Sequence, residues 1–307
     1  MIIFLNPLWI ATLLPSNSGS YPIFAQQVYE NPRENTGQIV CVNCHLAQKS
    51  VSIEIPKAIV PDQIFEAVVN IPYDLNLKQV AGNGKRVSLN VGAVLILPED
   101  FKLAPKELIS LETKRKTKGV FVQPYNKTKP NILVVGPITG INHQEIIFPL
   151  LSPNPSKSLK TNFLTYPVYV GANRGRGQVY PNGERSNNTI FTTAVSGQVR
   201  SIRAGLKSSK SKVTITVQKL DGRTFTQTIS KGVSIIASPS DVIGPDEPLT
   251  VDPNVGGFGQ AETEIVLQNP NRVRGMIVFF MLIIITQVFL IFKKKQVEKI
   301  QLAEINF

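Results

Sequence analysis

The chain has 307 residues and a formal net charge of +12, from 33 Lys and Arg against 21 Asp and Glu. This length allows a sizeable core and more than one domain, whereas two cysteines exclude a disulfide-stabilised scaffold. A basic surface favours acidic proteins or anionic lipid as partners. Nucleic acid is not expected, because no binding motif is present and the basic residues are not interleaved with aromatic ones.

The first 20 residues are typical of a leader that is removed. An apolar stretch at residues 8–14 is followed by Ser-Asn-Ser-Gly-Ser. Ser18 and Ser20 are small residues at the two positions that a signal peptidase reads, which predicts cleavage before Tyr21. A membrane anchor here is excluded by length, because Pro7 and Pro15 bound the apolar run.

Residues 41–45 read Cys-Val-Asn-Cys-His, a C-x-x-C-H motif that contains both cysteines of the chain. This motif is typical of c-type haem attachment. The two thiols can each add to a vinyl group of one porphyrin, and His45 then supplies the proximal iron ligand. The alternatives are a redox dithiol, a structural disulfide or a zinc site, although zinc needs four ligands and only His143 remains. We therefore expect one haem c, covalently bound by Cys41 and Cys44.

Most of the sequence after the motif is typical of β-strands. Short β-rich or alternating runs are separated by many of the 22 prolines and 21 glycines. Helical character is confined to two short segments, 36–47 and 105–111. The pattern predicts an all-β protein, a sandwich, in which the strand-rich residues 190–252 form a small inserted domain. The expected strands are 51–55, 64–71, 87–91, 93–97, 132–135, 166–170, 212–217, 223–229 and 262–267.

Two glycine-rich segments, 171–178 and 256–259, do not match nucleotide-binding motifs. Neither contains G-x-x-x-x-G-K-[ST] or G-x-G-x-x-G. We interpret them as tight turns, or as backbone that passes close to a flat ligand.

Residues 276–292 read MIVFFMLIIITQVFLIF, a candidate transmembrane helix. Seventeen helical residues span about 26 Å, which crosses the hydrocarbon core if Arg274 and Lys293 reach the interfaces. A buried core helix is disfavoured, because the segment is apolar on every face. The lysines at 293–295 predict that the basic tail, residues 293–307, stays on the side of synthesis.

The haem iron needs a second axial ligand or an open position. Methionine is a common choice, but Met1 lies in the leader and Met276 and Met281 lie in the apolar segment. Two candidates remain, His143 and the α-amino group that cleavage before Tyr21 would create. An α-amine has a pKa of about 7.7–8.0, so its neutral form is readily accessible.

Together, these motifs resemble the cytochrome f family, the haem subunits of the photosynthetic cytochrome bf complex. The resemblance runs from Tyr21 to Phe307 and includes YPIFAQQ at 21–27, the C-x-x-C-H motif, NRGRGQ at 173–178, NVGGFGQ at 254–260 and KKK at 293–295. It implies a large immunoglobulin-like β-sandwich made of residues 21–189 and 253–271. A small inserted domain at 190–252, a transmembrane helix at 272–292 and the basic tail complete the implied organisation.

The resemblance also implies a function. Members of the family carry electrons, and do not convert a bound substrate. The implied donor is a Rieske iron–sulfur protein, and the implied acceptor is plastocyanin or a soluble c-type cytochrome. A b-type cytochrome and other subunits complete the complex. The implied location is the chloroplast thylakoid membrane, crossed once, with the large domain in the lumen and the tail in the stroma.

Finally, the resemblance implies roles for individual residues. The iron ligands would be His45 and the α-amine of Tyr21, and Pro22 and Phe24 match residues that shield the haem. The family's buried water chain falls on Gln79, Asn173, Gln178, Asn188 and Asn254. Its basic docking patch falls on Lys78, Lys85, Arg86 and Lys207.

Overall fold

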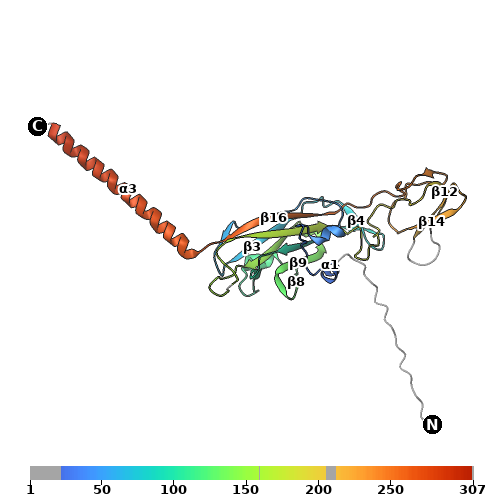
Figure 1. The fold of residues 1–307 in the computed structure, drawn as a ribbon, viewed down its shortest axis with the longest axis horizontal. Coiled ribbons are helices and arrows are strands. Elements are labelled where there is room, and N and C mark those ends of the chain that lie inside the picture. Colours follow the sequence, from blue (N-terminus) through green and yellow to red (C-terminus); the bar gives the residue numbers. More distant parts are fainter. Residues whose placement is uncertain (1–21, 159, 205–211, 306–307) are drawn as a thin grey trace, which may run out of the picture.

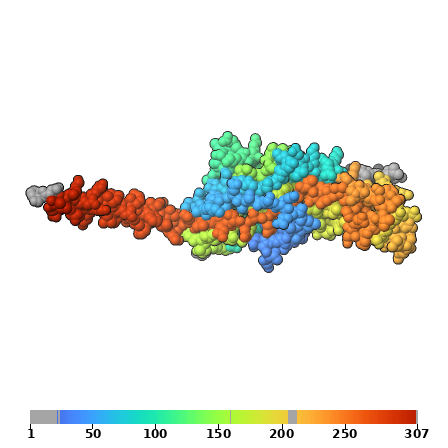
Figure 2. All heavy atoms as spheres, turned by 90° about the horizontal axis from the view of Figure 1, so that it is seen from above, coloured from blue at the N-terminus to red at the C-terminus, as the bar shows by residue number. Residues whose placement is uncertain are grey.

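A computed structural model describes residues 22–158, 160–204 and 212–305 (Figure 1). The leader, Tyr21 and Lys207 lie outside these residues. Within them the chain consists mainly of β-sheets and has one long apolar helix at its C-terminal end, which confirms the all-β class with a candidate membrane helix. Figure 2 shows an elongated molecule in which this helix leaves one end of the body.

A six-stranded sheet and a four-stranded sheet form a sandwich. The strand orders are β2-β16-β11-β6-β9-β8 and β1-β3-β10-β7, and all pairs are antiparallel except β2 with β16. The six-stranded sheet contains β2 (Ala58–Ile59), β6 (Asn90–Ile96), β8 (Val122–Asn126), β9 (Lys129–Thr139), β11 (Thr165–Arg174) and β16 (Gly257–Leu267). The four-stranded sheet contains β1 (Ser52–Glu54), β3 (Ile64–Asn70), β7 (Lys102–Leu103) and β10 (Glu145–Leu151).

The six-stranded sheet is buried on both faces at its centre. Successive side chains of a strand point to opposite faces. Leu95 of β6 and Leu133 of β9 therefore belong to the core between the sheets. Their neighbours Val94 and Val134 belong to a second apolar cluster, on the outer face. This explains why residues 132–135 are apolar without alternation. It also leaves an apolar surface on the outer face of the sheet, which other segments of the chain must cover.

Short helical segments lie outside the sheets. They are α1 (Pro22–Val28), η1 (Val40–Asn43), α2 (Leu111–Lys116) and η2 (Gly140–Asn142). The helix expected at 36–47 is wrong in extent, because only the 3₁₀ turn η1 forms there. The helix expected at 105–111 is also wrong. The helix begins six residues later, at Leu111, since Ser110 caps α2 by accepting a 3.1 Å hydrogen bond from the Thr113 amide.

A second four-stranded sheet, in the order β14-β13-β12-β15, lies at the end of the molecule opposite the long helix (Figure 1). Its strands all lie within residues 190–252, and they bury a separate apolar cluster that includes Ile215, Val217 and Leu249. They are β12 (Gly197–Ala204), β13 (Val213–Gln218), β14 (Thr224–Ile229) and β15 (Val242–Ile243).

A two-stranded hairpin of β4 (Lys78–Val80) and β5 (Arg86–Ser88) lies against this part of the chain. At its turn, Gly84 packs so closely on Gly232 that a Cβ on Gly232 would lie 2.5 Å from the Gly84 carbonyl oxygen. The single strand expected at 87–91 is incorrect, because these residues belong to two different strands. The chain instead leaves the hairpin at Ser88 and enters β6 at Asn90.

The C-terminal helix α3 (Pro270–Ile305) is 36 residues long and has no buried residue. It begins where the Asn269 side chain accepts a hydrogen bond of 2.9 Å from the Asn271 amide. The apolar segment lies inside it, which fits a transmembrane helix. The helix continues beyond residue 292, where the transmembrane segment is expected to end, and includes the lysines at 293–295. Its total length is about 54 Å.

Candidate functional site

A cavity of about 780 Å³, measured with its open mouth, lies on the outer face of the six-stranded sheet. Cys41, Cys44 and His45 all line it, so the three side chains of the motif face one space. Most of the remaining wall is apolar and includes Pro22, Phe24, Ala25, Val40, Val94, Tyr125, Val134 and Phe258.

The motif is held in place at both of its ends. On the N-terminal side, the Ile39 amide donates to the Gln260 side chain at 3.0 Å. Within the motif, the amides of Cys44 and His45 both donate to the Cys41 carbonyl, at 3.2 and 3.0 Å. On the C-terminal side, the Cys44 carbonyl accepts from the Gln178 amide at 2.7 Å. The chain therefore turns tightly enough to present both thiols and the imidazole together.

Glycines in β16 allow the segment after the motif to lie directly on the sheet. The Phe258 amide donates to the Ala47 carbonyl, and the Lys49 amide donates to the Phe258 carbonyl, both at 2.8 Å. A Cβ on Gly259 would lie 2.1 Å from the Lys49 carbonyl oxygen, which is a severe clash. The glycine-rich segment at 256–259 thus provides room for backbone of this chain.

Tyr125, in β8, fixes helix α1 at the mouth of the cavity. Its hydroxyl group bonds to the carbonyl oxygens of Ala25 at 2.8 Å and of Tyr29 at 2.7 Å. The Gln26 side chain donates to the Tyr125 carbonyl at 2.8 Å. Burial raises the pKa of the Tyr125 hydroxyl, which therefore remains protonated. Sequence reasoning missed this residue, since about 100 residues separate it from its partners and no local pattern marks it.

His45 is buried and uncharged. Its Nε2 lies 3.2 Å from the amide nitrogen of the Asn173 side chain, while Nδ1 is buried without a hydrogen-bond partner among the described residues. Desolvation lowers the pKa of His45 from 6.5 to about 4. The imidazole is therefore neutral near pH 7, which is the form that ligates metals.

Both cysteines are free thiols in the structure. Burial raises the pKa of Cys41 to about 12, with the nearby Cys44 thiol as a second cause, and burial also raises the pKa of Cys44. The two side chains are thus protonated thiols that face an apolar space. No cluster of three or more metal-ligating side chains of the His, Cys, Asp or Glu type occurs in the described part of the chain.

Three of the five polar residues implied by the resemblance meet around the Arg176 carbonyl. The side chains of Gln178 and Asn188 both donate to the Arg176 carbonyl, at 3.1 and 2.8 Å. Asn188 also donates to the Asn254 side chain at 3.2 Å. The Asn173 side chain lies 3.2 Å from His45 Nε2 and donates to the Gly175 carbonyl at 3.3 Å. Gln79 bonds within the β4–β5 hairpin, to the Ser88 carbonyl at 3.0 Å.

The resemblance also implies a basic patch, and three of its residues lie together. Lys78, Lys85 and Arg86 are exposed on the β4–β5 hairpin. Lys207 lies outside the described residues, so its place relative to the other three stays a prediction.

Comparisons with known proteins cover both halves of the chain. Family models of apocytochrome f match it, the N-terminal model over residues 21–175 and the C-terminal model over residues 187–307. Proteins named cytochrome f are 56% identical in Emiliania huxleyi, over 96% of this chain and 94% of that protein, and 54% identical in Guillardia theta, over 99% and 95%. A third, from Chlorokybus atmophyticus, is 54% identical over 99% and 95%.

Among solved structures, a cohesin module from a Clostridium perfringens family 33 glycoside hydrolase aligns with 71% of this chain and 96% of its own. Its TM-score of 0.26 and identity of 10% are too low to support any inference. The family models and the relatives are decisive, because they cover nearly all of the sequence at high identity. The chain therefore belongs to the cytochrome f family, the c-type cytochromes of the cytochrome bf complex.

Proposed function

We propose that this chain binds one haem c through thioether bonds from Cys41 and Cys44 and carries single electrons through it. The observation that supports this best is the shared cavity, which both thiols and the imidazole of His45 line. When bound, haem c supplies reversible one-electron oxidation and reduction of its iron. The chain itself would not make or break bonds in a bound substrate.

The residues present fit this cofactor. Protonated thiols are the groups that add to porphyrin vinyl groups, and neutral imidazole is an iron ligand. The cavity supports this fit, because His45 lines it together with both thiols, and the buried Nδ1 of His45 has no hydrogen-bond partner among the described residues. The apolar wall excludes water, so the environment favours a low local dielectric around the iron.

The second iron ligand in this proposal is the α-amino group of Tyr21, formed when residues 1–20 are removed. Pro22 and Phe24 line the cavity. Cleavage before Tyr21 would create the free amine on the residue that directly precedes Pro22. The alternative ligand, His143, follows η2 and is not among the cavity residues; its Nδ1 lies 2.7 Å from the Thr139 carbonyl oxygen.

The proposed partners follow from the family. The Rieske iron–sulfur protein would be the donor, and plastocyanin or a soluble c-type cytochrome would be the acceptor. Lys78, Lys85 and Arg86, together with Lys207, would attract an acidic acceptor. Gln79, Asn173, Gln178, Asn188 and Asn254 would hold buried water, since each amide both donates and accepts. A b-type cytochrome would be another neighbour in the complex.

The proposal also includes an organisation and an orientation. Residues 21–189 and 253–271 would form the haem domain, with 190–252 as an inserted domain. The separate apolar cluster of the second four-stranded sheet supports this division. The large domain would face the thylakoid lumen and the basic tail the stroma, because the lysines at 293–295 favour the side of synthesis.

The test is whether haem stays on the chain after denaturation. The full chain is produced with a haem c maturation system, extracted with acidified acetone and examined as its pyridine haemochrome. We expect haem to remain with the protein, and expect it to be lost when Cys41 and Cys44 are both changed to Ser. Haem that enters the acetone phase from the unaltered chain would refute covalent attachment. N-terminal sequencing of the same sample checks cleavage before Tyr21.

A further inference from the structure

The end of the sandwich from which α3 leaves carries an exposed apolar surface, formed by Val60, Phe163 and Leu164. We call these three residues the anchor-side surface. Their exposed fractions are 40%, 39% and 55%. Val60 lies between β2 and β3, whereas Phe163 and Leu164 lie between β10 and β11. Three large apolar side chains from two separate loops therefore share one end of the molecule.

Backbone hydrogen bonds place this surface directly beside the anchor. The Leu267 amide donates to the Leu164 carbonyl at 3.0 Å, and the Gln268 amide donates to the Ile59 carbonyl at 2.8 Å. Helix α3 begins at Pro270, only two residues after Gln268. The chain between the surface and the helix is thus too short for the two to separate while these bonds are intact.

The length of the first helical turns sets the height of this surface above the membrane. The apolar segment begins at Met276, six residues after the start of α3, which corresponds to about 9 Å along the axis. The polar headgroup layer is about 5–8 Å thick on each side of the hydrocarbon core. When α3 spans the bilayer, the anchor-side surface lies at the outer edge of that layer.

Charged side chains around this surface suit lipid phosphate groups. Lys57 is exposed and forms no ion pair with any described residue. Lys157 and Lys160 are each 72% exposed at their side chains, although Asp62 and Glu99 pair with them at 3.1 and 3.4 Å. Arg272 and Arg274 add two cations in the first turns of α3, and no acidic residue occurs between Pro270 and Phe292.

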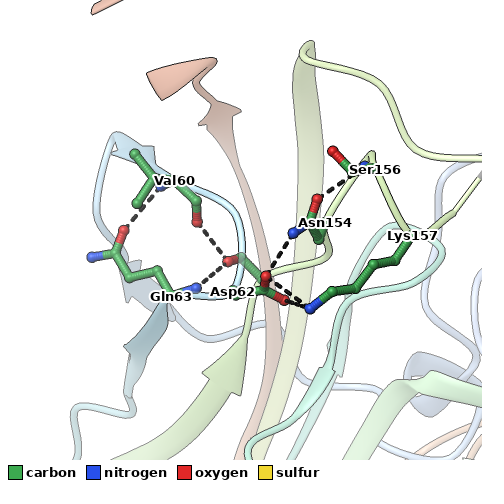
Figure 3. A network of polar contacts seen from close by, with 7 residues as sticks. Val60, Asp62, Gln63, Asn154, Ser156 and Lys157 are labelled. Carbon is green, nitrogen blue, oxygen red and sulfur yellow. Dashed lines mark hydrogen bonds and ion pairs between the residues drawn. The ribbon is translucent and has the colours of Figure 1, made fainter. Parts of the chain in front are cut away.

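A polar network joins the two loops that form the surface (Figure 3). Asp62 accepts a hydrogen bond of 2.6 Å from the Asn154 side chain. The Ser152 hydroxyl group donates to the Val60 carbonyl at 2.7 Å and accepts from the Gln63 amide at 2.8 Å. These hydrogen bonds hold the two loops together. Val60 and Leu164 remain exposed, so the surface is formed before any partner binds.

We propose that the anchor-side surface docks on the lipid headgroup layer of the membrane that α3 crosses. Phe163 and Leu164 enter the layer between headgroups, and Lys57, Lys157 and Lys160 lie against lipid phosphates. Docking fixes the tilt of the sandwich relative to the membrane, because contact at this end supplements the single helical tether. The proposal does not depend on the haem or on the electron partners.

The experiment places a spin label on the surface of the full-length, haem-loaded chain. Leu164→Cys carries the nitroxide, and the chain is reconstituted alone into nanodiscs of phosphatidylcholine with phosphatidylglycerol. Leu220→Cys, in the turn between β13 and β14 and 98% exposed, is the matched control at the opposite end. Power saturation then measures collisions of each label with a water-soluble nickel chelate and with oxygen.

We expect the label at 164 to collide with the nickel chelate at least threefold less often than the label at 220, and more often with oxygen. Changing Lys57, Lys157 and Lys160 to Gln should reduce this protection, and so should discs without phosphatidylglycerol. Equal nickel accessibility at 164 and 220 would overturn the proposal. A label at 164 that is accessible in discs but protected in the assembled complex would also overturn it, because a protein subunit would then cover the surface.

Discussion

A guanidinium nitrogen of Arg176 donates a 2.6 Å hydrogen bond to the side-chain oxygen of Asn187 in the interior of the protein. The same nitrogen donates to the Val80 carbonyl at 2.7 Å. The Asn187 amide group in turn donates to the carbonyls of Ala81 and Lys231, at 2.8 and 3.1 Å. This pair of side chains therefore ties the β4–β5 hairpin to the part of the chain that follows β14.

Replacing Asn187 with Ala should destabilise the protein by about 1–3 kcal/mol or more. The buried guanidinium of Arg176 would lose a close acceptor, and the cost of an unsatisfied buried group is larger when the group is charged. Denaturant titration followed by circular dichroism measures the change. Asn76→Ala is the control, because Asn76 is exposed and its side chain bonds to the neighbouring Asp74, which is exposed as well. Equal stability of the two variants would contradict a role for the pair.

Replacing Gly259 with Ala should destabilise the protein and reduce haem content. The new Cβ would lie 2.1 Å from the Lys49 carbonyl oxygen, so the segment four residues after His45 must shift. Overpacking of this kind costs about 1–3 kcal/mol. The measurements are the denaturant midpoint and the ratio of haem absorbance to protein. Gly244→Ala is the matched control, since the nearest atom to its Cβ would be 3.8 Å away, and it should change neither quantity.

The stability of the haem-free chain should depend on pH through His45. Burial lowers its pKa in the folded chain from 6.5 to about 4, so the unfolded chain binds this proton first as the pH falls. The stability that neutral His45 contributes is present above pH 6.5 and is lost progressively between about pH 6.5 and 4. The full effect is up to about 3 kcal/mol.

Carboxylates also titrate in the lower part of this range, so the informative quantity is a difference between variants. The free energy of unfolding of the haem-free chain should fall more steeply with acid than that of His45→Gln. His143→Gln is the control and should retain the steep dependence, because it leaves His45 in place. Parallel curves for the unaltered chain and His45→Gln would refute the assignment to His45.

Neutralising the hairpin charges should slow electron transfer to an acidic acceptor at low salt. The change is Lys78, Lys85 and Arg86 to Gln, and the expected result is at least a tenfold lower second-order rate in stopped-flow mixing with plastocyanin. The difference should shrink as ionic strength rises, since salt screens exposed charges. The control neutralises Lys114, Arg115 and Lys118, exposed residues in or near α2. Equal rates for these two triple variants would show that net charge alone matters.

The sequence was sufficient to predict the fold class and the anchor, because both depend on local patterns. Alternating runs such as 212–217 and 223–229 became β13 and β14 almost unchanged. The apolar run at 276–292 lies wholly within α3. Local patterns were less informative at the edges of elements. Leu89 fits a strand by composition, yet the chain leaves one sheet and enters another at that residue.

The sequence identifies the reactive groups of the candidate site but not the residues that surround them. The C-x-x-C-H motif alone indicates two thiols and an imidazole, and its three side chains do line one cavity. Tyr125 and Phe258 were not predicted, since they meet the motif only when β8 and β16 take their places in the sheet. The clash that a side chain at Gly259 would cause is likewise a contact between segments about 210 residues apart.

The two-sided burial of β6 and β9 has a consequence for assembly. A shift of either strand by a single residue would turn Val94 or Val134 inward and Leu95 or Leu133 outward. Such an error would ruin the interior of the sandwich and the wall of the cavity at the same moment. Correct pairing of these strands is therefore required for both. A chain that has formed the core of the sandwich has also formed this wall of the cavity.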